Sequence, residues 1–345
     1  MSMYSEIYEQ PITLNRLIKE QWPIIEEVAK KIKKHNYPIV LMAGRGTSDN
    51  VCRYAGYLWG AKNKLLVALA LPSLFSLYHE PPSLLQSVVV GVSQSGQSPD
   101  ILSVLDEGRR QGTITVAITN NNSSPLSKAA DYSINILTGE ENAIAATKTY
   151  TAQLLIIAMI SCALSGDRKS RNELTNLEGW VEKILTKDLI IKEIAYHYKN
   201  IEKCVVLGRG FNYASAFEWA LKLKELSFIA AEPYSSADFH HGPIAVINKD
   251  FPVLVIAPKG MALPSMINSV KILKEGLSAD IITISNDRGL LNTSDHKISL
   301  PSNMPEWLSP IPSIIAGQLF AYHLTCAKGL DPEKPRTINK VTKTM

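Results

Sequence analysis

Cysteine is scarce in this chain: 345 residues contain only four, and no two of them lie close together. Without a C-x-x-C pair, the sequence predicts neither a zinc ribbon nor a thioredoxin-like redox motif. The neighbours of each thiol are largely apolar, which is typical of buried free cysteines in a reducing cytoplasm. We therefore expect buried, unreactive thiols at Cys52, Cys162, Cys204 and Cys326.

Clustered positive charge and long apolar runs are also missing. The formal net charge is only +4, and apart from residues 30–34 the basic side chains are spread along the chain, so no nucleic-acid partner is predicted. The most apolar segment, 154–164, is shorter than the about 20 residues that span a bilayer, and predicts a buried helix without membrane contact. Because the first residues lack the pattern of a signal peptide, we expect a cytoplasmic protein.

Two nucleotide-binding motifs are incomplete. The loop at residues 93–98 has no lysine and is not a P-loop, so ATP is not implied. Gly44-Arg45-Gly46 lacks the third glycine of the dinucleotide fingerprint, and no acidic residue follows a second strand as that motif requires. The sequence therefore predicts no cofactor.

The loop Ser93-Gln94-Ser95-Gly96-Gln97-Ser98 is the most informative segment that is present. It follows the apolar run Val88–Val92, which predicts a buried parallel strand, and it precedes the helix-start signals Pro99 and Asp100. Backbone N–H groups and the helix dipole favour an anion there, and the hydroxyls add donors. We interpret the loop as a phosphate-monoester site; an ordinary polar loop is the alternative.

The chain also contains an internal duplication. Gly44-Arg45-Gly46 recurs 164 positions later as Gly208-Arg209-Gly210, and the strand-like runs recur with it while alternating with helical stretches. This alternation predicts an α/β fold with two doubly wound parallel-sheet domains, each a three-layer αβα sandwich. The predicted parts are a helical segment at 1–35, a first domain at 36–165, a helical linker at 166–200, a second domain at 201–330 and a tail at 331–345.

In the second domain the charged side chains gather on one predicted helix. Glu218, Lys222 and Glu225 have the spacing i, i+4 and i+7, which places them on one helix face. A carboxylate held beside a lysine suits proton transfer. A solvated salt-bridge stripe is the alternative interpretation.

A histidine pair, His240-His241, follows this helix and precedes the turn signal Gly242-Pro243. Adjacent histidines point in different directions and no third ligand has suitable spacing, so no metal site is predicted. A histidine on a rigid turn suits general acid–base work, although it can equally cap a loop. The tail is expected to be exposed, but a lysine on a docked tail would reach a carbonyl substrate.

Taken together, these motifs resemble the tandem sugar-isomerase (SIS) domain proteins, especially the isomerase half of glucosamine-6-phosphate synthase and the stand-alone SIS-type glucosamine-6-phosphate deaminases. The resemblance runs from about Pro38 to the terminus. The motifs that carry it are Ser93-Gln94-Ser95-Gly96, Ala145-Ala146-Thr147-Lys148, Leu221-Lys222-Leu223-Lys224-Glu225, His241-Gly242-Pro243 and the tail from Pro335-Arg336 to Lys340.

The resemblance implies a hexose or hexosamine 6-phosphate as the ligand, without metal or cofactor. The residues that match phosphate ligands are Ser48, Ser93, Gln94, Ser95 and Ser98. Weaker matches to the sugar-binding residues are Gly46, Thr47, Ile144 and Ala145. Ala146 stands where the synthase has serine, so one sugar contact is missing.

The resemblance also implies the catalytic roles. Glu225 would move a proton between C1 and C2, supported by Glu218 and Lys222. His241 would open the sugar ring from the neighbouring subunit, which implies a homodimer. A lysine of the tail, which lies over the active site in such proteins, would engage the keto sugar. Lys340 matches this lysine, and Lys343 is the alternative register.

The activity expected from this resemblance is the conversion of glucosamine 6-phosphate and water to fructose 6-phosphate and ammonia. Glutamine-dependent synthesis is not expected, because the chain shows neither the glutaminase domain nor its amino-terminal cysteine nucleophile. The alternatives are a related activity on galactosamine or fructosamine 6-phosphate, ammonia-dependent synthesis, and a non-catalytic sugar-phosphate sensor.

Overall fold

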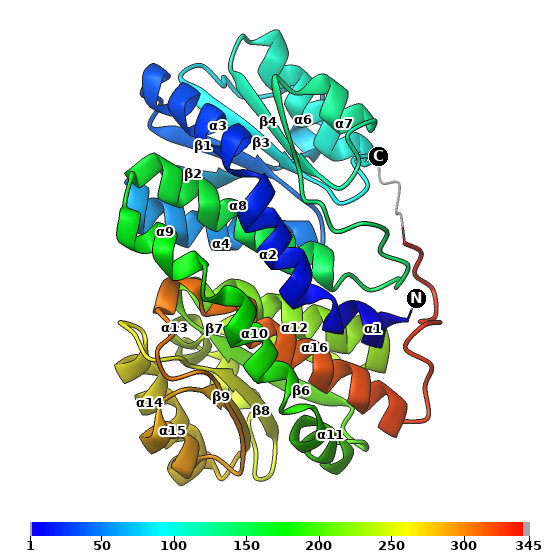
Figure 1. Ribbon diagram of the computed structural model, residues 1–345. Helices are drawn as coiled ribbons and strands as arrows, with labels where there is room; N and C mark the ends of the chain where they lie inside the picture. Colours follow the sequence, from blue (N-terminus) through cyan, green and yellow to red (C-terminus); the bar gives the residue numbers. More distant parts are fainter. Residues whose placement is uncertain (1, 341–345) are drawn as a thin grey trace. The chain divides into compact units, whose positions relative to one another are not determined.

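A computed structural model describes residues 2–340, and their contacts divide them into two compact units (Figure 1). The first-repeat unit comprises residues 12–142, 148–176 and 339–340. The second-repeat unit comprises residues 2–11, 143–147 and 177–338. Each unit contains one parallel sheet with helices on both faces, which confirms the predicted fold class. The domain limits given above remain predictions.

The first-repeat sheet has the strand order β2-β1-β3-β4-β5, and all neighbours are parallel. Its central strands are wholly buried, since α3 and α4 pack against one face while α6 and α7 pack against the other, and α8 packs on α3 and α4. The strands are β1 (Ile39–Ala43), β2 (Leu66–Leu69), β3 (Ser87–Val92), β4 (Ile114–Thr119) and β5 (Tyr132–Asn135). The helices from α2 to α9 are α2 (Gln10–Glu20), α3 (Trp22–His35), α4 (Thr47–Asn63), α5 (Ser73–Ser76), α6 (Pro99–Arg110), α7 (Pro125–Ala129), α8 (Lys148–Ser165) and α9 (Arg168–Leu174).

The second-repeat sheet has the order β10-β9-β8-β6-β7, again parallel throughout. Helices α12 and α11 contact one face, and α13 and α15 contact the other. The strands are β6 (Lys203–Gly208), β7 (Ala230–Ser235), β8 (Pro252–Ile256), β9 (Asp280–Ser285) and β10 (His296–Ser299). The helices are α1 (Met3–Tyr8), α10 (Leu177–Leu185), α11 (Asp188–His197), η1 (Gly210–Asn212), α12 (Tyr213–Ser227), α13 (Ser236–His240), η2 (Pro243–Val246), α14 (Leu263–Lys271), η3 (Ile272–Gly276), α15 (Arg288–Thr293), η4 (Glu306–Leu308) and α16 (Pro310–Ala327).

The duplication is confirmed by topology. When the strands are numbered within each repeat, both sheets have the order 2-1-3-4-5. Four strands of each repeat are predicted from the sequence, and the fifth, which lies at one edge of each sheet, is not: β2 in the first and β7 in the second. Strand β7 contains Pro233, which a central strand would not tolerate but an edge strand does.

Helix α8 is apolar and long enough by composition to cross a membrane, yet 83% of that stretch is buried within the protein. It forms part of the core, as predicted for residues 154–164. Cys52, Cys162 and Cys204 are buried, as predicted. The prediction was wrong for Cys326, which is exposed because it lies in the last turn of α16, next to the solvated end of the helix.

Candidate active site

Two polar loops lie at the carboxyl edge of the first-repeat sheet. Because β1 and β3 are parallel neighbours, the segments that follow them, 44–49 and 93–98, leave the sheet side by side. An ion pair joins them: Nε and Nη2 of Arg45 donate to Asp100 Oδ2 over 3.1 and 2.6 Å. Asp100 is buried in the first turn of α6, and Ser76 donates to its other oxygen. The Arg45–Asp100 pair therefore fixes the first loop against the helix that follows the second.

The 93–98 loop holds its own shape through its hydroxyls. Ser93 is buried, and its Oγ accepts from the Gly96 N–H over 3.1 Å. Gly96 has a φ of +63°, and a Cβ there would lie 2.2 Å from Ser124 Oγ, so only glycine fits. Ser95 and Gln94 are half-buried and point into a cavity.

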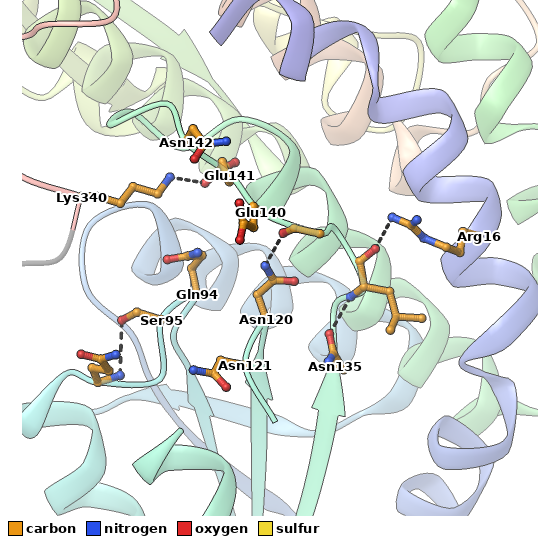
Figure 2. A pocket seen from close by; sticks show the side chains of 13 residues that line it. Arg16, Gln94, Ser95, Asn120, Asn121, Asn135, Glu140, Glu141, Asn142 and Lys340 are labelled. Carbon is orange, nitrogen blue, oxygen red and sulfur yellow. Dashed lines mark hydrogen bonds and ion pairs between the residues drawn. The ribbon is translucent and has the colours of Figure 1, made fainter. Parts of the chain in front are cut away.

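This cavity lies within the first-repeat unit and has a volume of about 780 Å³ (Figure 2). Most of its lining side chains carry an amide or a charge, and Ser95 adds a hydroxyl, so the cavity offers many partners to a polar ligand. The lining residues are Arg16, Gln94, Ser95, Gln97, Asn120, Asn121, Asn135, Leu137, Gly139–Asn142 and Lys340. Three predicted site residues thus meet here: Gln94, Ser95 and Lys340.

Lys340 enters the cavity from the tail and ends at a carboxylate (Figure 2). Its Nζ lies 2.5 Å from Glu141 Oε2, and the Glu141 side chain is fully shielded from solvent. The alternative lysine, Lys343, lies outside the described residues.

The other residues predicted to bind the ligand, on the 44–49 loop and at the start of α6, do not line this cavity. Ser48 is buried, and its Oγ is 3.4 Å from Gln153 Oε1. Gly46 and Thr47 form the start of α4, while Ser98 is the N-cap residue of α6 without a side-chain capping bond. Two weaker candidates, Ile144 and Ala145, belong by their contacts to the second-repeat unit.

In the second-repeat unit three charged residues of α12, Glu218, Lys222 and Glu225, form one cluster. Lys222 Nζ lies 2.5 Å from Glu225 Oε2 and 3.4 Å from Glu218 Oε1. The side chains of Lys222 and Glu218 are 0% exposed, and that of Glu225 is 22% exposed. A solvated stripe is therefore excluded. Buried charges are retained only when paired, and here one carboxylate, that of Glu225, still reaches solvent.

The two histidines differ sharply. His240 is half-buried, with Nε2 2.9 Å from Ser269 Oγ. His241 follows the end of α13 and is exposed, ahead of Gly242 with a φ of +125°. Among the described residues, no group of three His, Cys, Asp or Glu side chains is arranged to hold a metal ion.

Sequence reasoning missed the far wall of the cavity. Asn120 and Asn121 directly follow β4, and Glu141 and Asn142 lie between β5 and α8. The signal for the two asparagines was present, because polar residues directly after a strand-like run lie at the same sheet edge as the serine loop. Nothing in the sequence distinguished Glu141 from its exposed neighbour, Glu140.

Two doubly wound parallel sheets from one duplication, with a serine-rich loop at the carboxyl edge of the first, define a tandem α/β protein. A family model described as the SIS domain matches residues 38–162 and again residues 197–328. The chain belongs to the SIS-domain family.

Known relatives agree with this assignment. The chain is 33% identical over 347 residues to the glutamine–fructose-6-phosphate aminotransferase (isomerizing) of Thermococcus kodakarensis, which covers 98% of this chain and 57% of the relative. This chain thus spans little more than half the length of that curated relative. The C-terminal domain of glucosamine-fructose-6-phosphate aminotransferase from Francisella tularensis superposes with a TM-score of 0.88 at 27% identity, covering 96% of this chain and 98% of that one.

A glucosamine-6-phosphate deaminase from Thermotoga maritima also superposes, with a TM-score of 0.76 and 99% coverage of both chains. At 21% identity this likeness shows the shared fold alone.

Proposed function

We propose that the protein is an amino-sugar phosphate deaminase of the SIS family, converting glucosamine 6-phosphate and water to fructose 6-phosphate and ammonia. The observation that carries the proposal is the cavity of the first-repeat unit, in which an amine, Lys340, and the serine loop that follows β3 line one polar space. An amine together with hydroxyl and amide donors suits a ligand that bears both a phosphate and a carbonyl carbon.

Phosphate binding is assigned to Ser48 and to the loop with Ser93, Gln94, Ser95 and Ser98. Hydroxyl, amide and backbone N–H donors at the start of a helix suit an anion without a buried cation. Anchoring the phosphate would hold C1 and C2 of the sugar at a fixed distance from the reacting groups, which is a large source of rate enhancement.

Proton transfer is assigned to the second-repeat unit. His241 would pass a proton to the ring oxygen as the bond between C1 and that oxygen breaks and the C1 hydroxyl loses its proton, giving the open-chain amino aldose. Glu225 would then take the proton from C2 and return it to C1, while O1 gains a proton and the nitrogen loses one. The amino aldose thus becomes a ketose imine. Lys222 orients the Glu225 carboxylate through their 2.5 Å contact, and Glu218 orients Lys222 in turn.

Hydrolysis completes the reaction. Water adds to C2 of the imine, the C2–N bond breaks, and ammonia leaves with fructose 6-phosphate as the second product. At this stage Lys340 is assigned to contact the sugar at its keto carbon. No residue is required to accept electrons, since C1 is reduced as C2 is oxidised.

A second candidate is the opposite direction, in which ammonia and fructose 6-phosphate give glucosamine 6-phosphate. The name of the Thermococcus kodakarensis relative, an aminotransferase, favours it. Activity on galactosamine or fructosamine 6-phosphate, and sugar-phosphate sensing without turnover, remain as further alternatives. A sensor needs the serine loop but has no use for the buried Glu218–Lys222–Glu225 cluster.

The test is a substrate panel. We expect ammonia release from glucosamine 6-phosphate that exceeds release from galactosamine and fructosamine 6-phosphates. The reverse assay supplies fructose 6-phosphate with ammonia and follows the amino sugar. Binding of sugar phosphates without turnover in either direction would leave only the sensor.

A further inference from the structure

The ion pair between Lys340 and Glu141 is unequal in its burial. The Glu141 side chain is 0% exposed, whereas that of Lys340 is 25% exposed. A carboxylate shielded to this extent is costly unless hydrogen bonds and a cation compensate it. The position of Glu141 is therefore set by the interior of the first-repeat unit, and its charge faces the cavity.

Helix α8 fixes the carboxylate. Glu141 Oε1 accepts from the backbone N–H of Thr149 over 3.1 Å, and Oε2 accepts from Thr149 Oγ1 over 2.9 Å. Thr149 is buried in the first turn of α8, where the helix dipole favours a negative charge. The carboxylate is thus anchored to the most deeply buried helix of its unit.

Lys340 lies on an irregular segment. The residues from 331 to 340 form turns and bends without helix or strand. A lysine on such a segment has many conformations to lose when it is held in one place. In the structure the Lys340 amine is directed at Glu141, 2.5 Å away, in the cavity that Gln94 and Ser95 also line (Figure 2).

We propose that Glu141 is a positioning residue that holds the Lys340 amine in the cavity before the sugar arrives. The inference rests on the proposed function, in which Lys340 engages the keto carbon. Glu141 acts through Lys340: it orders the amine in advance, so that the amine is in place when the sugar binds. The gain is the usual one from proximity, since the reacting group is already ordered when the ligand binds.

The test uses Glu141→Gln, which removes the charge but keeps an amide oxygen that can accept from Thr149. The matched control is Glu26→Gln, which breaks the exposed Arg171–Glu26 pair on the outer surface of the same unit. Glu141→Asp serves as the conservative variant, with the charge retained on a shorter arm. Circular dichroism and thermal unfolding verify that each variant is folded.

The first readout is acetylation of Lys340 by N-hydroxysuccinimide acetate, followed by mass spectrometry without any substrate. In the wild type Lys340 should react about 10-fold more slowly than the exposed Lys30, the size of one charge-assisted hydrogen bond. Glu141→Gln should abolish this protection, Glu141→Asp should restore part of it, and Glu26→Gln should leave it intact. Equal rates of Lys340 acetylation in the wild type and in Glu141→Gln would show that Glu141 does not hold the amine.

The second readout is steady-state kinetics on the best substrate of the panel. Glu141→Gln should lower kcat by about 10-fold or more with little change in affinity for a sugar phosphate, and Glu141→Asp should recover part of the loss. An unchanged kcat despite faster acetylation would overturn the positioning role. Failure of the proposed function looks different, because the wild type and Glu26→Gln would then release no ammonia while the acetylation pattern stays as stated.

Discussion

Lys222 and Glu225 stand one helical turn apart on α12, and the amine of the first lies 2.5 Å from the carboxylate of the second. Lys222 is wholly shielded from solvent, but Glu225 keeps 22% of its side chain exposed. The pair therefore joins an inaccessible amine to a carboxylate that solvent can reach. Glu218, also fully buried, lies on the other side of Lys222 and completes its charge compensation.

Glu225→Gln tests the base itself. The substitution keeps the size of the side chain and its place on α12, so binding of a sugar phosphate should be preserved. Turnover should fall by at least about 100-fold, the usual scale for a positioned general base. Ammonia release and ligand affinity are measured on the same preparation, and near-normal release would remove Glu225 from the mechanism.

Lys222→Met tests how the cluster is stabilised. The methionine leaves the Glu218 carboxylate buried without its lysine, and removing one partner of a buried pair costs roughly 3–5 kcal/mol of stability. Urea denaturation should show a loss of this size. Adding Glu218→Gln should recover part of it, because the stranded charge is removed as well. Equal stabilities of the single and double variants would mean that the two side chains are not coupled.

The spacing of apolar residues predicted the architecture, because buried parallel strands and amphipathic helices need apolar side chains at regular positions. The runs at Val88–Val92 and Ile281–Ser285 are β-branched and lie in fully or almost fully buried strands. Two edge strands lack this pattern, because β2 is mostly exposed and β7 contains Pro233. These two were missed for that reason.

The site was predictable only in part. Spacing placed Glu218, Lys222 and Glu225 on one helix face, but it left their burial open, and burial is what separates this cluster from a solvated stripe. The pairing of Glu141 with Lys340 joins residues 199 positions apart in the sequence. No local pattern records such a contact, so it emerges only once the chain is folded.

Ser95→Ala combined with Ser98→Ala tests the phosphate loop. Each charge-assisted hydrogen bond contributes roughly 1.5–3 kcal/mol, so affinity for a sugar phosphate should fall by several kcal/mol at most. Affinity for the same sugar without phosphate should hardly change. Calorimetry with both ligands measures the difference, and equal losses would show that this loop does not recognise phosphate.

Buried thiols predict a sensitivity to alkali. Burial raises the pKa of both Cys162 and Cys204 to about 12, from an ordinary value near 9. Above pH 9 the unfolded chain releases protons that the folded chain retains, so stability is complete below pH 9 and declines as the pH approaches 12. Each thiol contributes a slope of about 1.4 kcal/mol per pH unit in that range.

The measurement is urea unfolding at pH 7.5, 9 and 10.5. The variant Cys162→Ala with Cys204→Ala should be less stable at pH 7.5, because each alanine leaves a small cavity. Between pH 9 and 10.5, however, it should lose less stability than the wild type. Parallel declines would show that other groups cause the alkaline loss.

The last prediction concerns assembly. His241 is exposed at the end of α13, and we propose that it serves the site of a second copy of the chain. Isologous pairing about a two-fold axis, the commonest arrangement of homo-oligomers, makes such sharing reciprocal. Glu225→Gln and His241→Asn should each be inactive alone. A mixed dimer has one site with both native groups and one site with neither, so each mixed dimer should regain up to about half the activity of a wild-type dimer. Random exchange of equal amounts makes about half of the dimers mixed, so the whole mixture should recover up to about a quarter.

Subunit exchange is established first, by native mass spectrometry of isotopically distinct chains. An inactive mixture then cannot be explained by a failure of the chains to exchange. A mixture of Glu225→Gln with a Glu218→Gln variant is the control, because both lesions then lie in the same helix and no intact site arises from sharing His241 alone. Exchange with no recovered activity in the first mixture would assign His241 to its own chain or to no catalytic role.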